Sequence, residues 1–201
     1  MRRIFPLFVC LLMATSALAQ DSTSSTKSGG SPKAFESTQQ LPEMKKLIET
    51  FSGRWRTTIT VEKNFWFPVA GTANGRADIQ AGPAGNSMTE RQRSNSPLGD
   101  FAGFGTYWYD PQTKSYKGIW CDSMDPRGCG DMGSANWDGS NFIVTNDMQM
   151  EKGKMHVRET FSNISHDSFD FMIEAGMGDA PLKKMMSIHY QRASAASSDR
   201  E

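Results

Sequence analysis

The sequence predicts an all-β domain, a single antiparallel up-and-down β-barrel of about ten strands with a short N-terminal helix that closes one end. Short runs with apolar and polar residues in alternation recur between residues 54 and 192, with turn residues between them. A helical period occurs before the first run and none lies between strands, which excludes a parallel α/β sheet and leaves a barrel or a sandwich. We favour the barrel because closure removes the edges that so many short strands would expose.

The predicted helix covers residues 41–51, LPEMKKLIETF, where the apolar side chains fall at helical spacing. Pro42 suits its first turn, and Gly53 suits its end. Beyond Gly53 the period changes to two, and Trp55 begins the apolar phase of a first strand that ends at Val61. One face of this helix and one face of this strand should therefore be buried.

The later runs with a period of two are separated by turns that supply Gly, Pro, Asn or Asp, such as GPAGN, DPQTK, WDGSN and EKGK. Each run has the length of one strand. The runs are GRADIQ (75–80), SMTERQRS (87–94), FGTYWY (104–109), SYKGIWCD (115–122), SANW (134–137), NFIVTNDMQM (141–150), KMHVRETFS (154–162), SFDFMIEA (168–175) and MMSIHYQR (185–192).

The N-terminus has the pattern of a secretory signal peptide. Arg2 and Arg3 precede a short apolar run, and SALAQ supplies the small residues that a signal peptidase reads. We expect a signal peptide over residues 1–20 and export to the bacterial periplasm or the extracellular space. Residues 21–40 and 193–201 are rich in Ser, Thr, Gly and Ala, which is typical of a disordered linker and tail. The barrel domain should span residues 41–192.

Charge and hydropathy exclude two classes of partner. Two of the 22 Lys and Arg residues lie in the signal peptide, so 20 remain against 22 Asp and Glu residues, without a basic cluster. Nucleic acid is therefore a poor partner. No second long apolar run follows the signal peptide, so no transmembrane segment is expected in the mature chain.

Two cysteines follow the signal peptide, Cys121 and Cys129, in CDSMDPRGC. In an oxidising compartment, a pair that brackets a loop with Pro and Gly predicts a disulfide. Two free or buried thiols are the alternative, because the sequence does not give the separation of the two Cα atoms. A zinc site would need two further ligands, and neither a CxxC nor a paired histidine spacing is present.

The helix-to-strand transition FSGRW resembles the entry of lipocalin-like barrels, in which a Gly-x-Trp plugs one end and an Arg of the last strand lies across the indole. The matching residues are Gly53, Trp55 and Arg192 of the terminal YQR. A guanidinium over an indole is worth about 1 to 2 kcal/mol when partly desolvated. An ordinary core Trp with Arg192 in solvent is the alternative.

A closer resemblance rests on FAGFGTYWYDPQTKSYKGIWCDS (101–123), followed by WDGSNF (137–142) and the terminal YQR. With FSGRW before them, these segments resemble the bacterial family known as domain of unknown function 1579, whose members are often exported. The similarity runs from about Leu41 to Arg192. It implies the fold and no catalytic residues, and the two cysteines depart from what we expect across the family.

The hairpin around the turn DPQTK supplies the candidate ligand site. If Tyr109 pairs with Tyr116, one face carries glycines among large aromatic side chains, and the other face carries lysines that prefer water. The first face should therefore point inward and leave room for a small apolar or aromatic molecule. Aromatic rings that cover glycines only to pack the sheet are the alternative. The predicted ligand-binding residues are Tyr107, Tyr109, Tyr116, Trp120 and Asp122.

Three functions remain open from the sequence. A module that binds a small hydrophobic or amphipathic molecule leads, because barrels of this size commonly hold one such ligand. An enzyme acting inside the barrel would rest on Asp122 and Glu90 as cavity acids, and a structural or interaction role is the third.

No catalytic residue, metal site or cofactor is predicted. The three histidines are scattered; His189 is a weak candidate for a haem ligand, since no CxxCH motif accompanies it. The methionines fit core packing better than copper capture.

Overall fold

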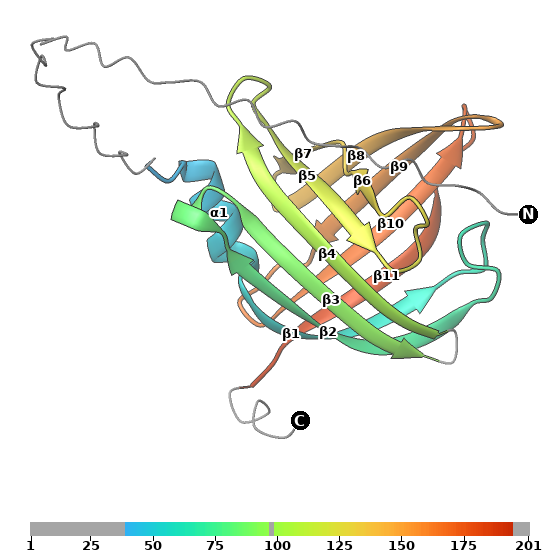
Figure 1. Cartoon of the computed structure of the whole chain (residues 1–201), viewed down its shortest axis with the longest axis horizontal. Coiled ribbons are helices and arrows are strands. Elements are labelled where there is room, and N and C mark those ends of the chain that lie inside the picture. The colour runs from blue at the N-terminus through green and yellow to red at the C-terminus, as the bar shows by residue number, and fades with distance from the viewer. Residues whose placement is uncertain (1–38, 97–98, 195–201) are drawn as a thin grey trace, which may run out of the picture. The chain divides into compact units, whose positions relative to one another are not determined.

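The computed structural model describes residues 39–96 and 99–194 (Figure 1). The predicted signal peptide, most of the predicted linker and most of the predicted tail lie outside these residues. The elements are α1 (Pro42–Phe51), β1 (Gly53–Val61), β2 (Gly71–Ala81), the 3-10 turn η1 (Pro83–Gly85), β3 (Met88–Ser96), β4 (Gly99–Asp110), β5 (Ser115–Asp122), β6 (Cys129–Asp131), β7 (Ser134–Asp138), β8 (Asn141–Met150), β9 (Gly153–Ser162), β10 (Ser168–Met177) and β11 (Lys183–Arg192).

The strands form one antiparallel sheet that closes on itself. Its order is β4-β3-β2-β1-β11-β10-β9-β8-β7-β5-β6, and an additional β4–β5 pairing completes the ring. Within the described residues, ten strands form the barrel wall and the short β6 lies beside β5, next to β7 in the chain. The predicted up-and-down barrel with a helix at one end is therefore confirmed.

Two local details differ from the sequence prediction. Strand β6 was not predicted, because its three residues, CGD, are too few to show a period. Helix α1 ends at Phe51 with Ser52 as its C-cap, so Gly53 does not end it. Gly53 instead begins β1 with φ of 150°, and a Cβ there would overlap the Arg192 guanidinium, which explains why this position is glycine.

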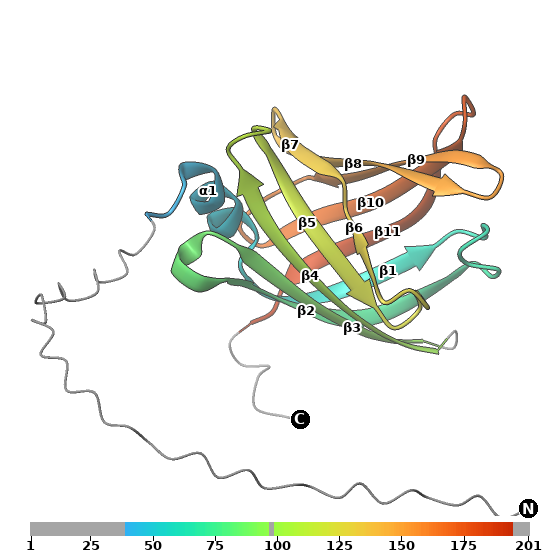
Figure 2. The ribbon, with the colours of Figure 1, turned by 45° about the horizontal axis from the view of Figure 1, so that its top comes forward.

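Helix α1 covers one end of the barrel (Figures 1 and 2). Its inner face carries Met44, Leu47 and Phe51, which are 0%, 0% and 1% exposed. Phe51 packs against the rings of Phe161 and Phe169 at 5.3 and 5.1 Å between centroids. This face supplies the apolar side chains that fill the barrel at that end, as the helical spacing predicts.

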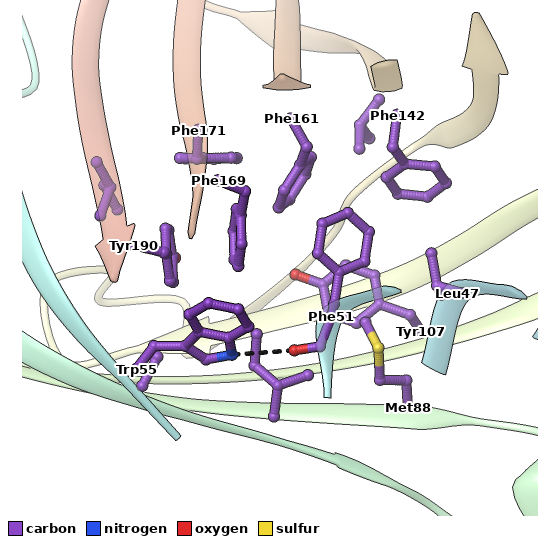
Figure 3. Close-up of a cluster of buried hydrophobic side chains, with 14 of the residues drawn as sticks. Leu47, Phe51, Trp55, Met88, Tyr107, Phe142, Phe161, Phe169, Phe171 and Tyr190 are labelled. Atoms are coloured by element: carbon purple, nitrogen blue, oxygen red, sulfur yellow. Dashed lines mark hydrogen bonds between the residues drawn. The ribbon is translucent and has the colours of Figure 1, made fainter. Parts of the chain in front are cut away.

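An aromatic cluster occupies the interior next to α1, as Figure 3 shows. The Trp55 Nε1 donates to the Phe51 carbonyl oxygen at 3.0 Å, which joins the first strand to the end of the helix. Trp55 packs edge to face on Phe169, and Phe169 stacks on Tyr190 at 4.2 Å. Contacts of this kind add stability beyond the burial of apolar area.

The β4–β5 hairpin has the predicted register. Tyr109 pairs with Tyr116, Tyr107 with Gly118 and Gly105 with Trp120. Tyr107 and Tyr116 are buried, whereas Trp108 on the opposite face is 37% exposed. The predicted inward face of the hairpin is therefore confirmed.

The other end of the barrel is formed by the loops β1–β2, β5–β6, β8–β9 and β10–β11 (Figures 1 and 2). A side chain bridges the sheet between β6 and β8: Asn146 Nδ2 donates to the Asp131 carbonyl oxygen at 2.7 Å.

No helix within residues 39–96 and 99–194 has the length and apolar character needed to cross a membrane.

Candidate functional site in the barrel interior

The interior is packed near α1, and a second buried cluster of Met155, Val157, Ala175 and Met185 fills part of the opposite end. Strand register assigns an inward direction to a set of side chains on the distal half of the wall, because they lie an even number of residues from buried ones. These inward side chains are nevertheless only partly buried. The main members of the set, which we call the lumen residues, are Phe101, Trp120, Met148, Ile173 and Met186.

The lumen residues are apolar, and so are several side chains at the end of the barrel opposite α1, which we call the rim. Four of the exposed large hydrophobic side chains lie on loops or strand ends at this rim, at exposures from 36% to 58%. They are Phe65, Val69, Met124 and Met177. Exposed apolar side chains beside partly exposed inward ones are typical of a site for a hydrophobic molecule.

Glu90 lies in the barrel interior on β3, between the buried residues Met88 and Gln92. It is 4% exposed and accepts hydrogen bonds from two buried tyrosines, Tyr190 at 3.0 Å and Tyr107 at 3.3 Å. Burial raises the pKa of Glu90 to about 7, although both tyrosine hydrogen bonds act to lower it. The same environment raises the pKa of both tyrosines.

Glu159 on β9 is a second interior carboxyl group. It pairs across the sheet with Val144 of β8 and Ile173 of β10, which places it on the inward face. Burial, and then the charge of Glu90, raise the pKa of Glu159 to about 7. The residue as a whole is partly exposed while its Oε2 is fully covered, and its inward neighbours on β9, Val157 and Phe161, are both buried.

Several buried polar atoms have no hydrogen-bond partner in the part of the chain that the structure describes. They include Glu159 Oε2, Gln92 Nε2 and Thr57 Oγ1. Gln92 is 4% exposed and Thr57 is 2% exposed. Buried polar atoms without partners are rare and costly in folded proteins, so this group is a candidate for contact with a ligand.

The chemistry open to this site follows from the two carboxyl groups. With pKa values about 7, each can hold or release a proton near neutral pH, as general acids and bases do. Each can also accept hydrogen bonds from a polar group of a bound molecule. We call Glu90, Glu159, Gln92 and Thr57 the polar centre.

In the strand register, the predicted residue Trp120 lies level with Glu90 through Gly105, and Asp122 lies level with Gln92 through Gly103. The Trp120 indole covers Gly103 and Gly105, since a Cβ at Gly105 would lie 2.8 Å from Trp120 Cε3. The glycines therefore accommodate the indole. Trp120 Nε1 donates to Asp122 Oδ2 at 3.1 Å, and Asp122 Oδ1 accepts from the Met124 backbone N–H at 2.7 Å. Asp122 thus orients Trp120 and holds the adjoining loop.

The predicted residues Tyr109 and Tyr116 lie at the other end, beside α1. The Tyr116 hydroxyl donates to the Glu43 carbonyl oxygen at 3.0 Å. Both tyrosines line an open groove of about 420 Å³ between α1 and β7, whose wall includes Trp137 and Lys46. The five predicted ligand residues therefore share an inward face without meeting in one pocket; Tyr107 lies between the two groups and contacts Glu90.

The structure brings together the three residues predicted to plug the barrel. Arg192 Cζ lies 4.2 Å from the centroid of the Trp55 ring, and Arg192 Nη1 donates to the Ser52 carbonyl oxygen at 3.1 Å, beside Gly53. The predicted disulfide is also present and joins Cys121 to Cys129. It connects β5 to β6 at the end of the barrel opposite α1.

The histidines do not enter the interior. His189 is exposed, and its Nδ1 lies 2.7 Å from Asp170 Oδ1 on the outer face, so the structure does not support the weighed haem ligand. His156 pairs with Asp147 and His166 with Asp167, also at the surface. No group of three His, Cys, Asp or Glu side chains arranged for a metal ion occurs within residues 39–96 and 99–194.

Sequence reasoning identified Glu90 and missed Glu159, Tyr190, Gln92 and Thr57. The missed signal is a polar residue in the apolar phase of a strand. In β9, Glu159 falls in the same phase as the buried Met155, Val157 and Phe161. A charged side chain in that phase is directed into the barrel and is therefore a site candidate.

Comparisons with known proteins agree with this architecture. A family model described as "Protein of unknown function (DUF1579)" matches residues 40–192. No curated protein sequence is significantly similar.

Three solved structures resemble the chain at low identity. The crystal structure of Rv2717c from M. tuberculosis is 11% identical over 78% of this chain and 100% of that chain, with a TM-score of 0.51. The S-type phycobiliprotein lyase CPES from Guillardia theta is 11% identical over 76% and 93%, with a TM-score of 0.51. A de novo designed fluorescence-activating β-barrel is 14% identical over 73% and 96%, with a TM-score of 0.40. At such identities the first two likenesses concern the fold alone.

Proposed function

The chain belongs to the DUF1579 family, and from the interior of its barrel we propose that it is an exported protein that binds one small hydrophobic or amphipathic molecule. The molecule enters through the end opposite α1 and lies against the lumen residues. Export is proposed from the N-terminal segment, in which two arginines precede the apolar run IFPLFVCLLMA.

The observation that carries the proposal is the partial exposure of inward-facing apolar side chains. In a filled barrel, such side chains would be as buried as Phe142 and Phe169 are near α1, at 1% exposure each. Trp120 and Phe101 face inward and remain partly exposed, and neither belongs to the buried clusters. Transfer of this apolar surface from water to a ligand favours binding.

The experiment is a thermal-shift screen of the purified, exported protein against fatty alcohols, fatty amines, fatty acids, quinones and aromatic metabolites. A molecule that binds only the folded barrel stabilises it by about 2.7 kcal/mol at a hundredfold excess over Kd. Trp120→Ala should weaken binding about tenfold, because the indole lies on the lumen wall. Trp108→Ala is the matched control, since Trp108 is on the outer face of the same hairpin.

The readouts separate the proposal from non-specific adsorption. A stabilising ligand should also change tryptophan emission in the parent and in Trp108→Ala. The proposal fails if no class of molecule raises the melting temperature, or if Trp108→Ala weakens binding as much as Trp120→Ala does.

A further inference from the structure

The polar centre carries acidic groups without a basic partner. Glu90 and Glu159 are close enough for the charge of one to act on the other. Within the described residues, Tyr107 and Tyr190 are hydrogen-bonded to Glu90, and the charge of Glu90 raises the pKa of Glu159. No Lys, Arg or His is among the groups that shift the pKa of Glu90 or Glu159. Two interior acids without a cation are an unusual arrangement in a folded protein.

The neighbours of Glu159 on both adjoining strands confirm this imbalance. Val144 of β8 and Ile173 of β10 lie directly opposite it, and neither titrates. The charged side chains of β9 itself, such as Arg158, point outward, where Arg158 Nη2 lies 2.6 Å from Glu174 Oε2. A negative charge in the interior is therefore not compensated by the wall.

The polar centre also has unused hydrogen-bonding capacity. Glu159 Oε2 can accept, Thr57 Oγ1 can accept or donate, and Gln92 Nε2 can donate. None of these three atoms has a partner among residues 39–96 and 99–194. Thr57 lies beside Tyr190 in the β1–β11 register, and Tyr190 donates to Glu90. Gln92 is two residues from Glu90 on the same inward face of β3.

We propose that the polar centre binds the ammonium group of an amphipathic amine, whose apolar part lies against the lumen residues. This inference rests on the proposed function and names the chemical class of its ligand. An ammonium group supplies the missing positive charge and three N–H donors for Glu159 Oε2 and its neighbours. Gln92 Nε2 can donate to an oxygen atom in the same head group. A carboxylate head would add a third negative charge and is disfavoured.

The test compares three probes of equal chain length, dodecylamine, dodecanol and dodecanoate, at concentrations below micelle formation. Affinity is measured at pH 8 by isothermal titration calorimetry and by tryptophan emission. Dodecylamine should bind at least about tenfold more tightly than dodecanol, and dodecanol more tightly than dodecanoate. Each tenfold step corresponds to one well-formed charged hydrogen bond.

Glu159→Gln should remove the preference for the amine while dodecanol binding persists. Glu151→Gln is the matched control, because Glu151 is exposed in the turn between β8 and β9. A second measurement uses the parent alone: binding of dodecylamine at pH 6.5, compared in buffers of different ionisation enthalpy, should release protons because the cation favours ionised carboxyl groups. Dodecanol should release none.

The outcomes distinguish this inference from the function on which it rests. Equal affinity for dodecylamine and dodecanol, or tighter binding of dodecanoate, overturns the amine site and leaves the lumen as a binding site. Absence of binding for all three probes overturns both. Proton release on amine binding, together with loss of the preference in Glu159→Gln, supports the amine site.

Discussion

Arg192, on the last strand of the barrel, lies over the indole of Trp55 on the first, with Cζ 4.2 Å from the ring centroid. Its Nε donates to the His166 carbonyl oxygen at 2.6 Å, and its Nη1 donates to Ser52. One guanidinium therefore joins the first strand, the end of α1 and the β9–β10 turn. This is the plug that the Gly-x-Trp pattern predicts.

Replacement of this guanidinium should destabilise the barrel. Arg192→Ala removes the stacking and the packing of the arginine stem, and we expect a loss of about 1 to 2 kcal/mol with a red shift of tryptophan emission. Arg56→Ala, on the exposed outer face of β1, should change stability by less than about 0.5 kcal/mol. Urea unfolding followed by fluorescence measures both, and equal effects of the two variants would show that Arg192 is only a surface charge.

The contact between Trp120 and the glycines predicts a position-specific effect of adding one methyl group. Gly105→Ala brings a Cβ to 2.8 Å from the Trp120 indole, which must shift to make room. We expect a loss of about 1 to 3 kcal/mol, as in other overpacked sites. At Gly130, which pairs with Trp120 from β6, a Cβ meets nothing within 4 Å. Gly130→Ala should therefore leave the melting temperature nearly unchanged, and a larger loss there than at Gly105 would contradict this account.

The two interior carboxyl groups predict that stability falls as pH rises. The pKa of Glu159 increases from 4.5 to about 7 on folding because burial disfavours the charged form. Between pH 4.5 and 7 the folded state holds a proton that the unfolded chain has released, so the free energy of unfolding decreases through this window. Glu90 acts in the same direction.

Glu159→Gln should reduce this pH dependence. The amide cannot ionise, so the variant should be more stable than the parent at pH 8 by about 1 to 3 kcal/mol, and the difference should shrink toward pH 5. Denaturant unfolding at several pH values measures the slope, with Glu151→Gln as the exposed control. A parent whose stability rises between pH 5 and 8, with the variant parallel to it, would refute the assignment.

The disulfide predicts a moderate loss of stability on reduction. Cys121 and Cys129 are separated by 8 positions, and closing so short a loop contributes about 2 to 3 kcal/mol. The double variant Cys121→Ala/Cys129→Ala should lose this amount, and reductant should bring the parent to the same stability. Two free thiols in the denatured, unreduced protein would end this prediction.

Repetition in the sequence made the barrel predictable. Alternation over each strand and the turn at DPQTK specified the register of Tyr109 with Tyr116, because a shift by one residue would have turned the lysines inward. The Trp55 and Arg192 contact followed from a resemblance to known barrels. Strand β6 was not predictable, since it depends on pairing across a loop that the disulfide closes.

The polar centre was only partly predictable. Glu90 was identified as an interior acid, but its link to Tyr190 spans 100 positions and depends on closure of the ring. Asp122 was expected to be a polar group at the edge of the cavity, and the sequence did not show that its two oxygens accept from Trp120 and from the adjoining loop. Alternation along a strand shows on which face of the sheet a residue lies. It does not show how far along the barrel axis the residue lies.

The seam between β1 and β11 has a consequence for how the chain folds. Arg192 and Ser52 are hydrogen-bonded although they lie 140 positions apart. Because β11 is the last described strand in the chain and pairs with β1, the ring can close only after all the other described strands have been synthesised. Non-local pairings of this kind slow folding. Until β11 docks, β1 and β10 each expose an unpaired edge that can associate with another chain. The rate at which β11 finds its place therefore sets how long newly made protein is vulnerable to aggregation.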